Sequence, residues 1–550
     1  MIIDARSLPE NTEISTDVCI VGAGTAGLTL AREFAGQKFR VCLLESGGLK
    51  PDPETQALYK GENIGHPYFS LDSARARYFG GSTNRWHIPI GEDCIGVRMR
   101  PLDEIDFEER DWVPNSGWPF KKSHLDPYYE RAQAVCRIEP SSYDVSDWEN
   151  PEKTPRLTLD SKRIHTVIFK FGSRLPFLVD YSKEITQAGN IATYLYANVT
   201  EVATDEGGRK ATRLKAACLN GKKFSIRAKI FILAAGAIEI PRLLLLSNKT
   251  HHAGLGNQHD LVGRFFMEHP HFWSGVYIPS VSEALKITAL YNRIHTVNGV
   301  PIIGKLSLSE ETIRREGLLN YVAELVPRTV LKTSLNQFFY PRIDSESVHS
   351  YQTIRSAIRN KKMPEDFKRH AGNIFNGLND FVVSAYRNIK RRTLRILDKK
   401  RILVFRLANM SEQMPNPDSR VTLDTECDAL NQRRVRFDWR LSETDIQSAV
   451  KSQQILDREL RRAGLGRLYI ELNDETPPRQ ITGGWHHMGT TRMHVDPQKG
   501  VVNENCRVHG IPNLFIAGPS VFPTSGYANP SLTIVALSLR LADHVKKLMA

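Results

Sequence analysis

Short apolar runs and helical spacings alternate from the start of the chain. Residues Val18–Val21 are apolar and mostly β-branched, which is typical of a fully buried strand. Apolar residues recur at helical spacing over 28–34, and a second apolar run over 40–44 ends on Glu45. The pattern predicts a strand, a helix and a parallel second strand. Three glycines stand between the first strand and the helix: Gly22, Gly24 and Gly27.

This glycine-rich turn has the spacing of a dinucleotide-binding site. Gly22 permits the tight turn, Gly24 allows close approach of a pyrophosphate, and Gly27 lets helix and strand pack closely. The helix N-terminus offers free N–H groups to phosphates. Glu45 can accept hydrogen bonds from an adenosine ribose, and its charge disfavours NADP. An ordinary glycine-rich turn in a parallel sheet is the alternative, and the pattern does not separate FAD from NAD.

Two later stretches return to the same sheet. An alternating pattern over 191–232 predicts a β-meander, and a buried strand from 230 ends at Gly236 before a helix over 238–246. Near the C-terminus, a buried strand over 514–517 precedes a helix over 530–545, with Asn529 as its expected N-cap. The sequence therefore predicts a sheet built from three separated parts of the chain.

From residue 272 the pattern changes to alternating strands, which predicts an antiparallel sheet. A helix follows over 442–462, with Ser442 as its N-cap. The predicted fold class is α/β, or α+β overall: a Rossmann-type domain assembled from separated segments, plus an antiparallel-sheet substrate domain with helices. The predicted ranges are 12–130 (cofactor domain, first part), 131–189 (connection and part of the substrate domain), 190–271 (cofactor domain, second part), 272–480 (substrate domain, with a basic insertion at about 350–401) and 481–550 (cofactor domain, third part).

Charge is concentrated in this insertion. Residues 355–401 contain fourteen Lys or Arg and four Asp or Glu, in a chain of net charge +13. The remainder is close to neutral, so a nucleic-acid role for the whole protein has little support. Residues 374–389 have the spacing of an amphipathic helix that ends at Lys390, Arg391 and Arg392. Two interpretations fit this pattern. The helix could be a solvated surface helix, or the segment 374–401 could dock on an anionic membrane or an acidic partner.

Composition narrows the remaining possibilities. The 550 residues are 41% hydrophobic and 25% charged, as in globular proteins, and suggest more than one domain. No apolar run approaches the roughly 20 residues of a membrane helix. The first residues resemble neither a secretory signal nor a twin-arginine signal, so a cytoplasmic location is expected. Seven scattered cysteines form no C-x-x-C pair, so neither a disulfide framework nor a metal site is predicted.

Two further motifs carry candidate chemistry. Residues 79–86, FGGSTNRW, suit a backbone pressed against a flat ligand, although a tight turn is the simpler explanation. Residues 483–492 read GGWHHMGTTR, and their adjacent histidines, His486 and His487, project in different directions. One can reach a ligand while the other packs behind it. Spacing alone leaves a structural role for both open.

Together these motifs resemble the glucose–methanol–choline (GMC) oxidoreductases, flavoenzymes that oxidise alcohols. The dinucleotide turn, the Gly-Gly loop, the mid-chain strand-Gly-helix and the His…Asn-Pro pair occur in the family's order over essentially the whole chain. The stretches 79–86, 235–241, 412–420 and 526–532 most resemble the pyranose oxidase-like, sugar-oxidising branch. The mid-chain signature departs at Ile240, where the family has Ser or Thr.

The resemblance implies specific site residues. It places the catalytic base at His486 and its partner at Asn529, with His487 and Gln413 near the substrate. The FAD contacts that it implies are Gly22, Gly24, Ala26, Gly27, Glu45, Gly81, Ser82, Asn84, Val199, Ala235, Gly518, Asn529 and Pro530. Some members attach FAD to a histidine that aligns with Arg85 here, so non-covalent FAD is expected, although His87 lies close by.

The resulting hypothesis is an FAD-dependent oxidoreductase that converts a CH–OH group of a sugar, glycoside or related alcohol to a carbonyl. His486, with an ordinary pKa near 6.5, would take the hydroxyl proton, and Asn529 would donate a hydrogen bond to the developing alkoxide. There are three alternatives. The protein could be a non-redox lyase on the same fold, an NAD-dependent or nucleotide-sensing protein, or a binding module recruited through the basic helix. Oxygen, a quinone or a protein could accept the electrons, and the oligomeric state is open.

Overall fold

The computed structural model describes residues 1–92, 94–281, 283–328, 404–472 and 481–550. The predicted helix at 374–389 and the basic segment 355–401 lie outside these residues. Every pairing in the first sheet is parallel. Its strand order is β1 (Ile2–Asp4), β9 (Ile191–Leu195), β4 (Val41–Leu44), β3 (Val18–Val21), β13 (Ile230–Leu233) and β22 (Leu514–Ile516).

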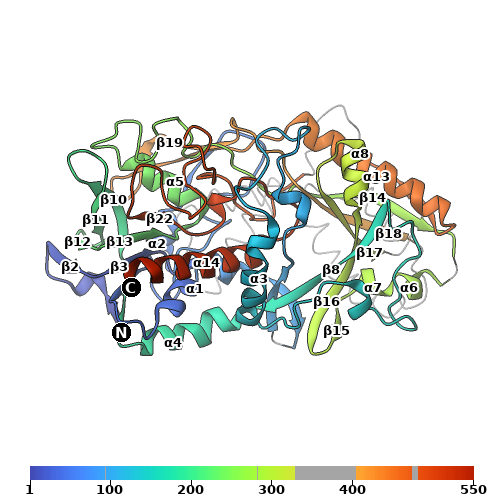
Figure 1. The fold of residues 1–550 in the computed structure, drawn as a ribbon, viewed down its shortest axis with the longest axis horizontal. Coiled ribbons are helices and arrows are strands. Elements are labelled where there is room, and N and C mark those ends of the chain that lie inside the picture. The colour runs from blue at the N-terminus through green and yellow to red at the C-terminus, as the bar shows by residue number, and fades with distance from the viewer. Residues whose placement is uncertain (93, 282, 329–403, 473–480) are drawn as a thin grey trace, which may run out of the picture.

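Helices cover this parallel sheet because its central strands are buried on both faces. Helix α1 (Thr25–Phe34) lies beside α14 (Ser531–Met549), and α14 also packs on α3 (Lys122–Cys136) (Figure 1). Helix α5 (Gly236–Leu246) contacts an adjoining sheet. That sheet has the order β10 (Asn198–Thr204), β11 (Ala211–Ala217), β12 (Lys223–Arg227) and β2 (Thr12–Ser15). The predicted assembly of the cofactor sheet from three separated parts is confirmed.

The largest sheet has nine strands, all antiparallel, and occupies the other half of the molecule (Figure 1). Its path is β21 (Gly466–Tyr469), β14 (His271–Pro279), β18 (Val404–Ser411), β17 (Tyr321–Arg328), β16 (Val300–Leu308), β8 (Ile164–Ser173), β7 (Cys94–Met99) and β6 (Ile88–Gly91), with β15 (His295–Val297) paired to β16. Helix α13 (Glu443–Arg462) contacts β21 and starts at a capping box in which Ser442 and Asp445 bond each other's backbone N–H.

Smaller elements connect these layers. A three-stranded sheet has the order β19 (Arg420–Cys427), β20 (Arg433–Asp438) and β5 (Gly61–Asn63). The short helices are α2 (Pro53–Ala57), α4 (Tyr181–Gln187), α6 (Ala284–Ile287), α7 (Ala289–Asn292) and α8 (Glu310–Glu316). The mixed architecture agrees with the predicted fold class.

The chain crosses between the two large sheets more often than the predicted domain ranges imply. Strands β6 and β7 fall within 12–130, yet they pair into the nine-stranded sheet. Strand β1 precedes residue 12 and pairs with the cofactor sheet. The reason is that the hairpin of β6 and β7, directly after the Gly-Gly loop, pairs with β8, a long-range pairing that periodicity does not reveal.

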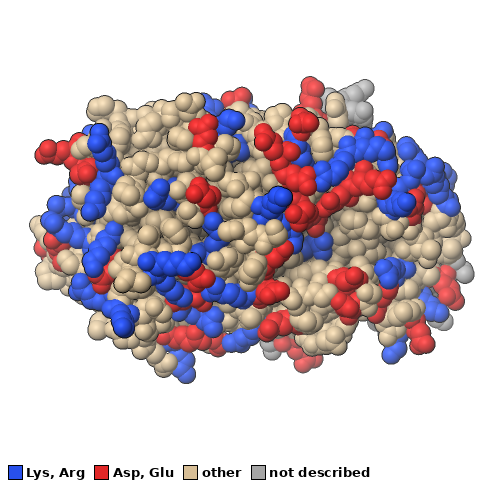
Figure 2. All heavy atoms as spheres, in the orientation of Figure 1, with Lys and Arg blue, Asp and Glu red and all other residues tan. Residues whose placement is uncertain are grey.

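Two surface properties complete the fold. Acidic and basic side chains are interspersed over the face shown in Figure 2. Within the described ranges, no helix combines the length and apolarity needed to cross a membrane.

Candidate active site

A cavity of about 510 Å³ opens where the strands of the cofactor sheet end. The residues that follow four of those strands line it: Gly22, Glu45, Ala235 and Gly518. In open parallel sheets, ligands bind in the crevice beyond the carboxyl ends of the strands. The cavity therefore occupies the expected position for a nucleotide cofactor, and it continues toward the nine-stranded sheet through residues of β6 and β7.

Close packing requires two of the glycines in the dinucleotide turn. Gly22 has a φ of +104°, and a Cβ atom there would lie 2.7 Å from the carbonyl oxygen of Ala234. A Cβ atom at Gly27 would lie 1.9 Å from the carbonyl oxygen of Gly22, so this glycine allows helix and strand to pack. Helix α1 starts after Gly24 without a side-chain cap, which leaves its first N–H groups available to a pyrophosphate.

Glu45 is held rigidly at the end of β4. Its Oε2 accepts a hydrogen bond from the Ala23 N–H at 3.0 Å, and its Oε1 accepts one from the Gly47 N–H at 2.9 Å. The Ser46 hydroxyl also donates to Oε1, at 3.2 Å. Because a carboxylate oxygen has two lone pairs, Oε2 can still accept a hydrogen bond from a ribose hydroxyl. Glu45 lines the cavity together with Val199.

His486 makes two hydrogen-bond contacts through its ring nitrogens. Its Nε2 lies 2.9 Å from Nδ2 of Asn529, and its Nδ1 lies 2.9 Å from Nδ1 of His269. His269 is fully buried, and its Nε2 lies 3.3 Å from the carbonyl oxygen of Ser525. Residues from three distant parts of the sequence thus form one continuous chain of contacts.

The backbone carbonyl of Ser525 determines where the protons lie in this series of contacts. The oxygen of Ser525 can only accept, so Nε2 of His269 carries its proton. The Nδ1 of a neutral His269 is then an acceptor, and Nδ1 of His486 must donate to it. This leaves the lone pair of His486 on Nε2, where it accepts from the Asn529 amide. The assignment follows from the hydrogen-bond network.

Burial keeps both imidazoles neutral. It lowers the pKa of His486 well below its ordinary value, and the neighbouring His269 and His271 lower it further. Burial also lowers the pKa of His269 to about 4. The expectation of an ordinary pKa for His486 is therefore wrong, because the side chain is removed from water and has no carboxylate beside its ring. At neutral pH it is a free base.

Glu268 fixes the loop that carries His486. Its Oε2 accepts from the backbone N–H groups of His269 and Gly484 at 3.0 Å each, and its Oε1 accepts from the His486 N–H at 2.8 Å. The hydroxyl of Tyr68 also donates to Oε1. Burial outweighs these bonds and raises the pKa of Glu268 to about 7. The side chain joins residues 268–269 to the loop 483–487.

The same cluster holds His487. Its Nε2 lies 2.8 Å from the Tyr68 hydroxyl, whose single proton goes to Glu268. His487 is therefore the donor, and burial lowers its pKa to about 3. His487 lines the cavity, so it is both held by the protein and available to a ligand.

Comparison with known proteins identifies this architecture. Residues 415–538 match the family model described as GMC oxidoreductase. The 2-methyl-1,2-propanediol dehydrogenase of Mycolicibacterium austroafricanum is 24% identical, over 97% of this chain and 95% of its own. The fructose dehydrogenase large subunit of Gluconobacter japonicus is 29% identical, over 97% and 98%. The C-terminal part of the chain therefore resembles GMC oxidoreductases, and the whole chain is similar to two named dehydrogenases.

Solved structures have the same fold. A formate oxidase superposes with a TM-score of 0.53 at 15% identity, covering 98% of this chain and 99% of its own. Pyridoxine 4-oxidase superposes with a TM-score of 0.50 at 15% identity, over 96% and 99%. These structures show the shared fold, and the dehydrogenases and oxidases among the relatives show that the chain is an oxidoreductase.

FAD is the dinucleotide that the resemblance implies, and the cavity has features that suit both ends of it. The N-terminus of α1 and Glu45 suit the pyrophosphate and the ribose. Asn529 was expected to cap α14, but that prediction is wrong: α14 starts at Ser531 after Pro530, no side chain caps it, and Asn529 contacts His486 instead. The free N–H groups of this second helix suit an electronegative edge of the flavin ring. The Asn529 Oδ1 atom is buried without a protein partner.

Most residues that the resemblance assigns to FAD line the cavity. They are Gly22, Gly24, Ala26, Glu45, Gly81, Ser82, Val199, Ala235, Gly518, Asn529 and Pro530. Two of the assigned residues do not. Gly27 packs inside the turn, and Asn84 bonds the carbonyl oxygens of Phe79 and Gly81 at 3.0 and 2.9 Å. Asn84 therefore shapes the Gly-Gly loop from behind.

Gln413 lies behind the cavity wall. Its Oε1 accepts from the backbone N–H of Glu268 at 2.8 Å and from Nε1 of Trp439 at 2.9 Å, and its Nε2 donates to the Arg440 carbonyl at 2.9 Å. It is fully buried and is absent from the lining. Gln413 therefore supports Glu268 from behind the cavity wall, and the expected position near the substrate is not observed.

An aromatic group lines the part of the cavity that faces the nine-stranded sheet. The ring of Trp485 meets Phe69 edge-on at a centroid distance of 5.5 Å and His87 at 5.8 Å. Trp485 Nε1 and His271 Nε2 are buried and have no protein partner. Such apolar surface with unpaired polar atoms is suited to a ring that bears hydroxyl groups.

Sequence reasoning missed most of these supporting residues. His269, Glu268 and His271 lie in the run 267–271, MEHPH, which we predicted only to close the second cofactor segment. Two histidines that flank a proline beside an acid were a usable signal. Tyr68 and Trp485 had no such signal, because only the fold brings them to the cavity.

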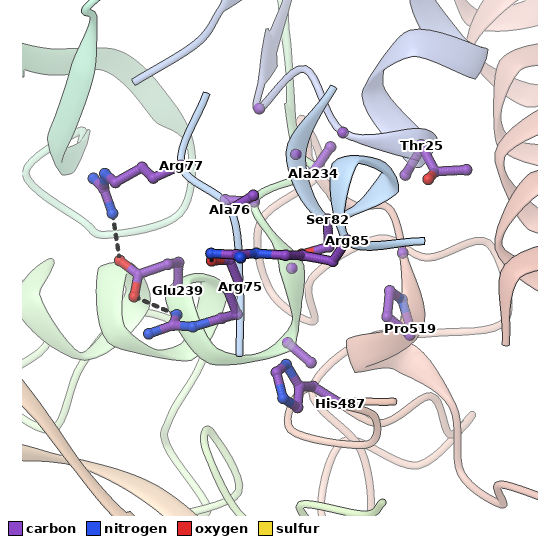
Figure 3. Close-up of a pocket in the computed structure, with 18 of the residues that line it drawn as sticks. Thr25, Arg75, Ala76, Arg77, Ser82, Arg85, Ala234, Glu239, His487 and Pro519 are labelled. Atoms are coloured by element: carbon purple, nitrogen blue, oxygen red, sulfur yellow. Dashed lines mark hydrogen bonds and ion pairs between the residues drawn. The ribbon is translucent and has the colours of Figure 1, made fainter. Parts of the chain in front are cut away.

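Arg75, Arg77 and Glu239 mark another side of the cavity (Figure 3). Glu239 pairs with Arg75 at 2.8 Å and with Arg77 at 3.2 Å. Arg242, Arg75 and Arg77 together outweigh the burial of Glu239 and lower its pKa to about 2. Arg85 donates to the Arg75 carbonyl at 3.2 Å and lines the cavity.

Proposed function

We propose that this oxidoreductase converts a CH–OH group of a sugar, glycoside or related alcohol to a carbonyl, with His486 as the base. The observation that carries the proposal is the unprotonated Nε2 of His486, which lies at the cavity beside the Asn529 amide. The names of several relatives point to sugar substrates: fructose dehydrogenase, C-glycoside 3-oxidase and paromamine 6'-oxidase. These names and the aromatic wall support the pyranose oxidase-like, sugar-oxidising assignment.

Bound FAD would supply the acceptor for the hydride that leaves the substrate carbon. The residues of the chain handle the proton and the geometry. His486 Nε2 takes the hydroxyl proton, and Asn529 Nδ2, until then bonded to that nitrogen, turns its N–H toward the substrate oxygen. His269 accepts the Nδ1–H bond, which becomes charge-assisted once His486 is protonated.

The contacts of FAD in this proposal are non-covalent. Position 85, where some family members have the histidine that attaches FAD, holds an arginine, which is always protonated and is not a nucleophile. His87 is occupied differently: its Nδ1 lies 3.3 Å from the Arg85 carbonyl, and its ring meets Trp485.

Anaerobic mixing tests the proposed reaction directly. The purified protein with its bound FAD would be mixed with sugars, glycosides and simple alcohols while the flavin absorbance near 450 nm is recorded. A substrate of an oxidoreductase bleaches the flavin, whereas a substrate of a lyase leaves it oxidised. In His486→Ala, we expect bleaching to slow by about a hundredfold or more, with FAD retained. Bleaching at the normal rate would contradict the role of His486.

A further inference from the structure

Three charged side chains lie together on the nine-stranded sheet at the substrate end of the cavity. Arg98 of β7 and Lys305 of β16 both contact Oε2 of Glu324 from β17, at 3.0 and 3.1 Å. Arg98 lies over the ring of Phe171, and Lys305 lies over that of Phe169. We call Arg98, Lys305 and Glu324 the sheet triad. It rests on an aromatic surface and is largely removed from water.

The sheet triad has an unbalanced charge. Two cations share one carboxylate, which leaves a net charge of +1. Lys305 has a lowered pKa of about 8 because it is buried and close to Arg98, yet it is still largely protonated at pH 7. Buried charges without a counterion are costly, and they persist where a function requires them.

No other acid in the described part of the chain supplies the missing counterion. The acidic residues that line the cavity are Glu45, Glu239 and Asp428. Glu45 accepts from backbone N–H groups, Glu239 pairs with Arg75 and Arg77, and Asp428 pairs with Arg242. The FAD pyrophosphate would lie at the N-terminus of α1, which belongs to the other large sheet.

Arg98 is the member of the triad that reaches the cavity. It lines the wall with Val97 and Ile88, and its side chain is 25% exposed, compared with 5% for Lys305. Its Nε is buried and has no protein partner. The charge of Arg98 also contributes to the lowered pKa values of His486 and His271. A guanidinium with free donors therefore lies within electrostatic range of the base.

We propose that Arg98 binds a carboxylate of the substrate, so that the enzyme oxidises a hydroxyl group of a sugar acid. This inference rests on the proposed function and deepens it. A net charge of +1 matches one carboxylate, whereas a phosphate dianion would leave a negative excess. A guanidinium can donate two parallel hydrogen bonds to a carboxylate. The carboxylate is unchanged in the reaction: the hydroxyl proton goes to His486, and bound FAD would accept the hydride.

The test must also distinguish substrate binding from a second role for the positive charge of Arg98. Arg98 could instead stabilise the negative charge of reduced FAD. In that case its removal would lower the reduction potential of the bound flavin and slow every substrate by the same factor. If Arg98 binds substrate, its removal changes kcat/KM for acids and for neutral sugars by different factors. The reduction potential of the flavin then stays the same.

The test compares matched substrates in Arg98→Gln, Arg98→Lys and the wild type. Aldoses would be compared with their aldonic and uronic acids by anaerobic flavin reduction. We expect the wild type to prefer an acid by at least about tenfold in kcat/KM, and Arg98→Gln to lose about thirtyfold or more for the acid, mainly in KM. Neutral sugars should change less than about threefold, and Arg98→Lys should recover part of the loss. Arg436→Gln, an exposed arginine on β20, is the matched control.

A binding measurement separates this inference from the proposed reaction. Acetate and a non-oxidisable sugar acid would be titrated into the holoenzyme while the FAD spectrum is recorded. A saturable spectral change that is lost in Arg98→Gln supports a carboxylate site even if no panel substrate bleaches the flavin. Three results would overturn the carboxylate site: no binding to the wild type, equal slowing of acids and neutral sugars in Arg98→Gln, or a lowered flavin potential in that variant. If bleaching requires His486 but not Arg98, the proposed reaction is supported and the carboxylate site is overturned.

Discussion

His269 and His486 lie with their Nδ1 atoms 2.9 Å apart, although 217 positions separate them in the sequence. Only one proton can occupy this contact. The Ser525 carbonyl assigns it to His486, so the proposed base, His486, is one of a pair of hydrogen-bonded imidazoles. The pair replaces the carboxylate that often supports a catalytic histidine, as in the serine hydrolase triad.

Substitution of His269 tests this pairing. His269→Leu removes the acceptor that stabilises protonated His486, so we expect flavin reduction to slow by about a hundredfold at its pH plateau. His269→Asn keeps an oxygen acceptor and should lose only about tenfold. A purely structural defect would slow flavin reduction equally in His269→Leu and His269→Asn. His295→Asn, on strand β15, is the control histidine.

Asn529 should affect the reaction more than cofactor binding. Its Nδ2 contacts His486, whereas its backbone stands just before α14. Asn529→Ala removes a hydrogen-bond donor from the developing alkoxide, so we expect flavin reduction to slow by about a hundredfold, as in comparable sites. FAD content, measured as the ratio of absorbance at 450 to 280 nm, should stay normal. Loss of FAD with an unchanged rate per bound flavin would contradict this role.

The buried histidines predict a loss of stability in acid. His269 has a pKa of about 4 when folded and about 6.5 when unfolded. As pH falls from 6.5 to 4, the unfolded chain takes up a proton that the folded protein does not, so the unfolding free energy decreases. The shift corresponds to roughly 3 kcal/mol for this residue. Thermal unfolding at pH 7 and pH 5 should show a smaller decrease in His269→Asn than in the wild type, and an equal decrease would be evidence against the shift.

Acid precipitation tests whether FAD is attached. Arginine at position 85 cannot form the bond that a histidine makes, so trichloroacetic acid should release all the flavin into the supernatant. A yellow pellet would show a covalent bond. In that case, His87→Gln would identify the residue, since His87 is the histidine of this loop that lines the cavity.

Gly27 should tolerate no side chain. A Cβ atom there would lie 1.9 Å from the Gly22 carbonyl oxygen, so Gly27→Ala must push α1 away from β3. We expect the protein to lose about 2 kcal/mol or more of stability, together with FAD. Gly189→Ala, at a position where a Cβ meets nothing within 4 Å, is the control for thermal unfolding. Equal melting temperatures for the two variants would contradict the close packing.

Much of the cofactor site could be predicted from the sequence because it is local. Strand β3, the three glycines, helix α1 and Glu45 lie within 28 consecutive residues, and each position has a backbone or charge requirement of its own. The positions of His486 and Asn529 came from the resemblance, since two adjacent histidines do not indicate which one faces a ligand. The resemblance also assigned Gln413 to the substrate, but the fold places it behind Glu268.

The sequence by itself determined the fold class, the dinucleotide turn and the sheet assembled from separate segments, because hydrophobic period and glycine spacing act over a few residues. Only the tertiary structure decided the protonation of His486 and the composition of the substrate end. His269, Ser525, Glu268, Tyr68 and the sheet triad converge from distant strands and loops. Periodicity shows which face of an element is buried but not what packs against it, and burial and neighbouring charges then determine the pKa values.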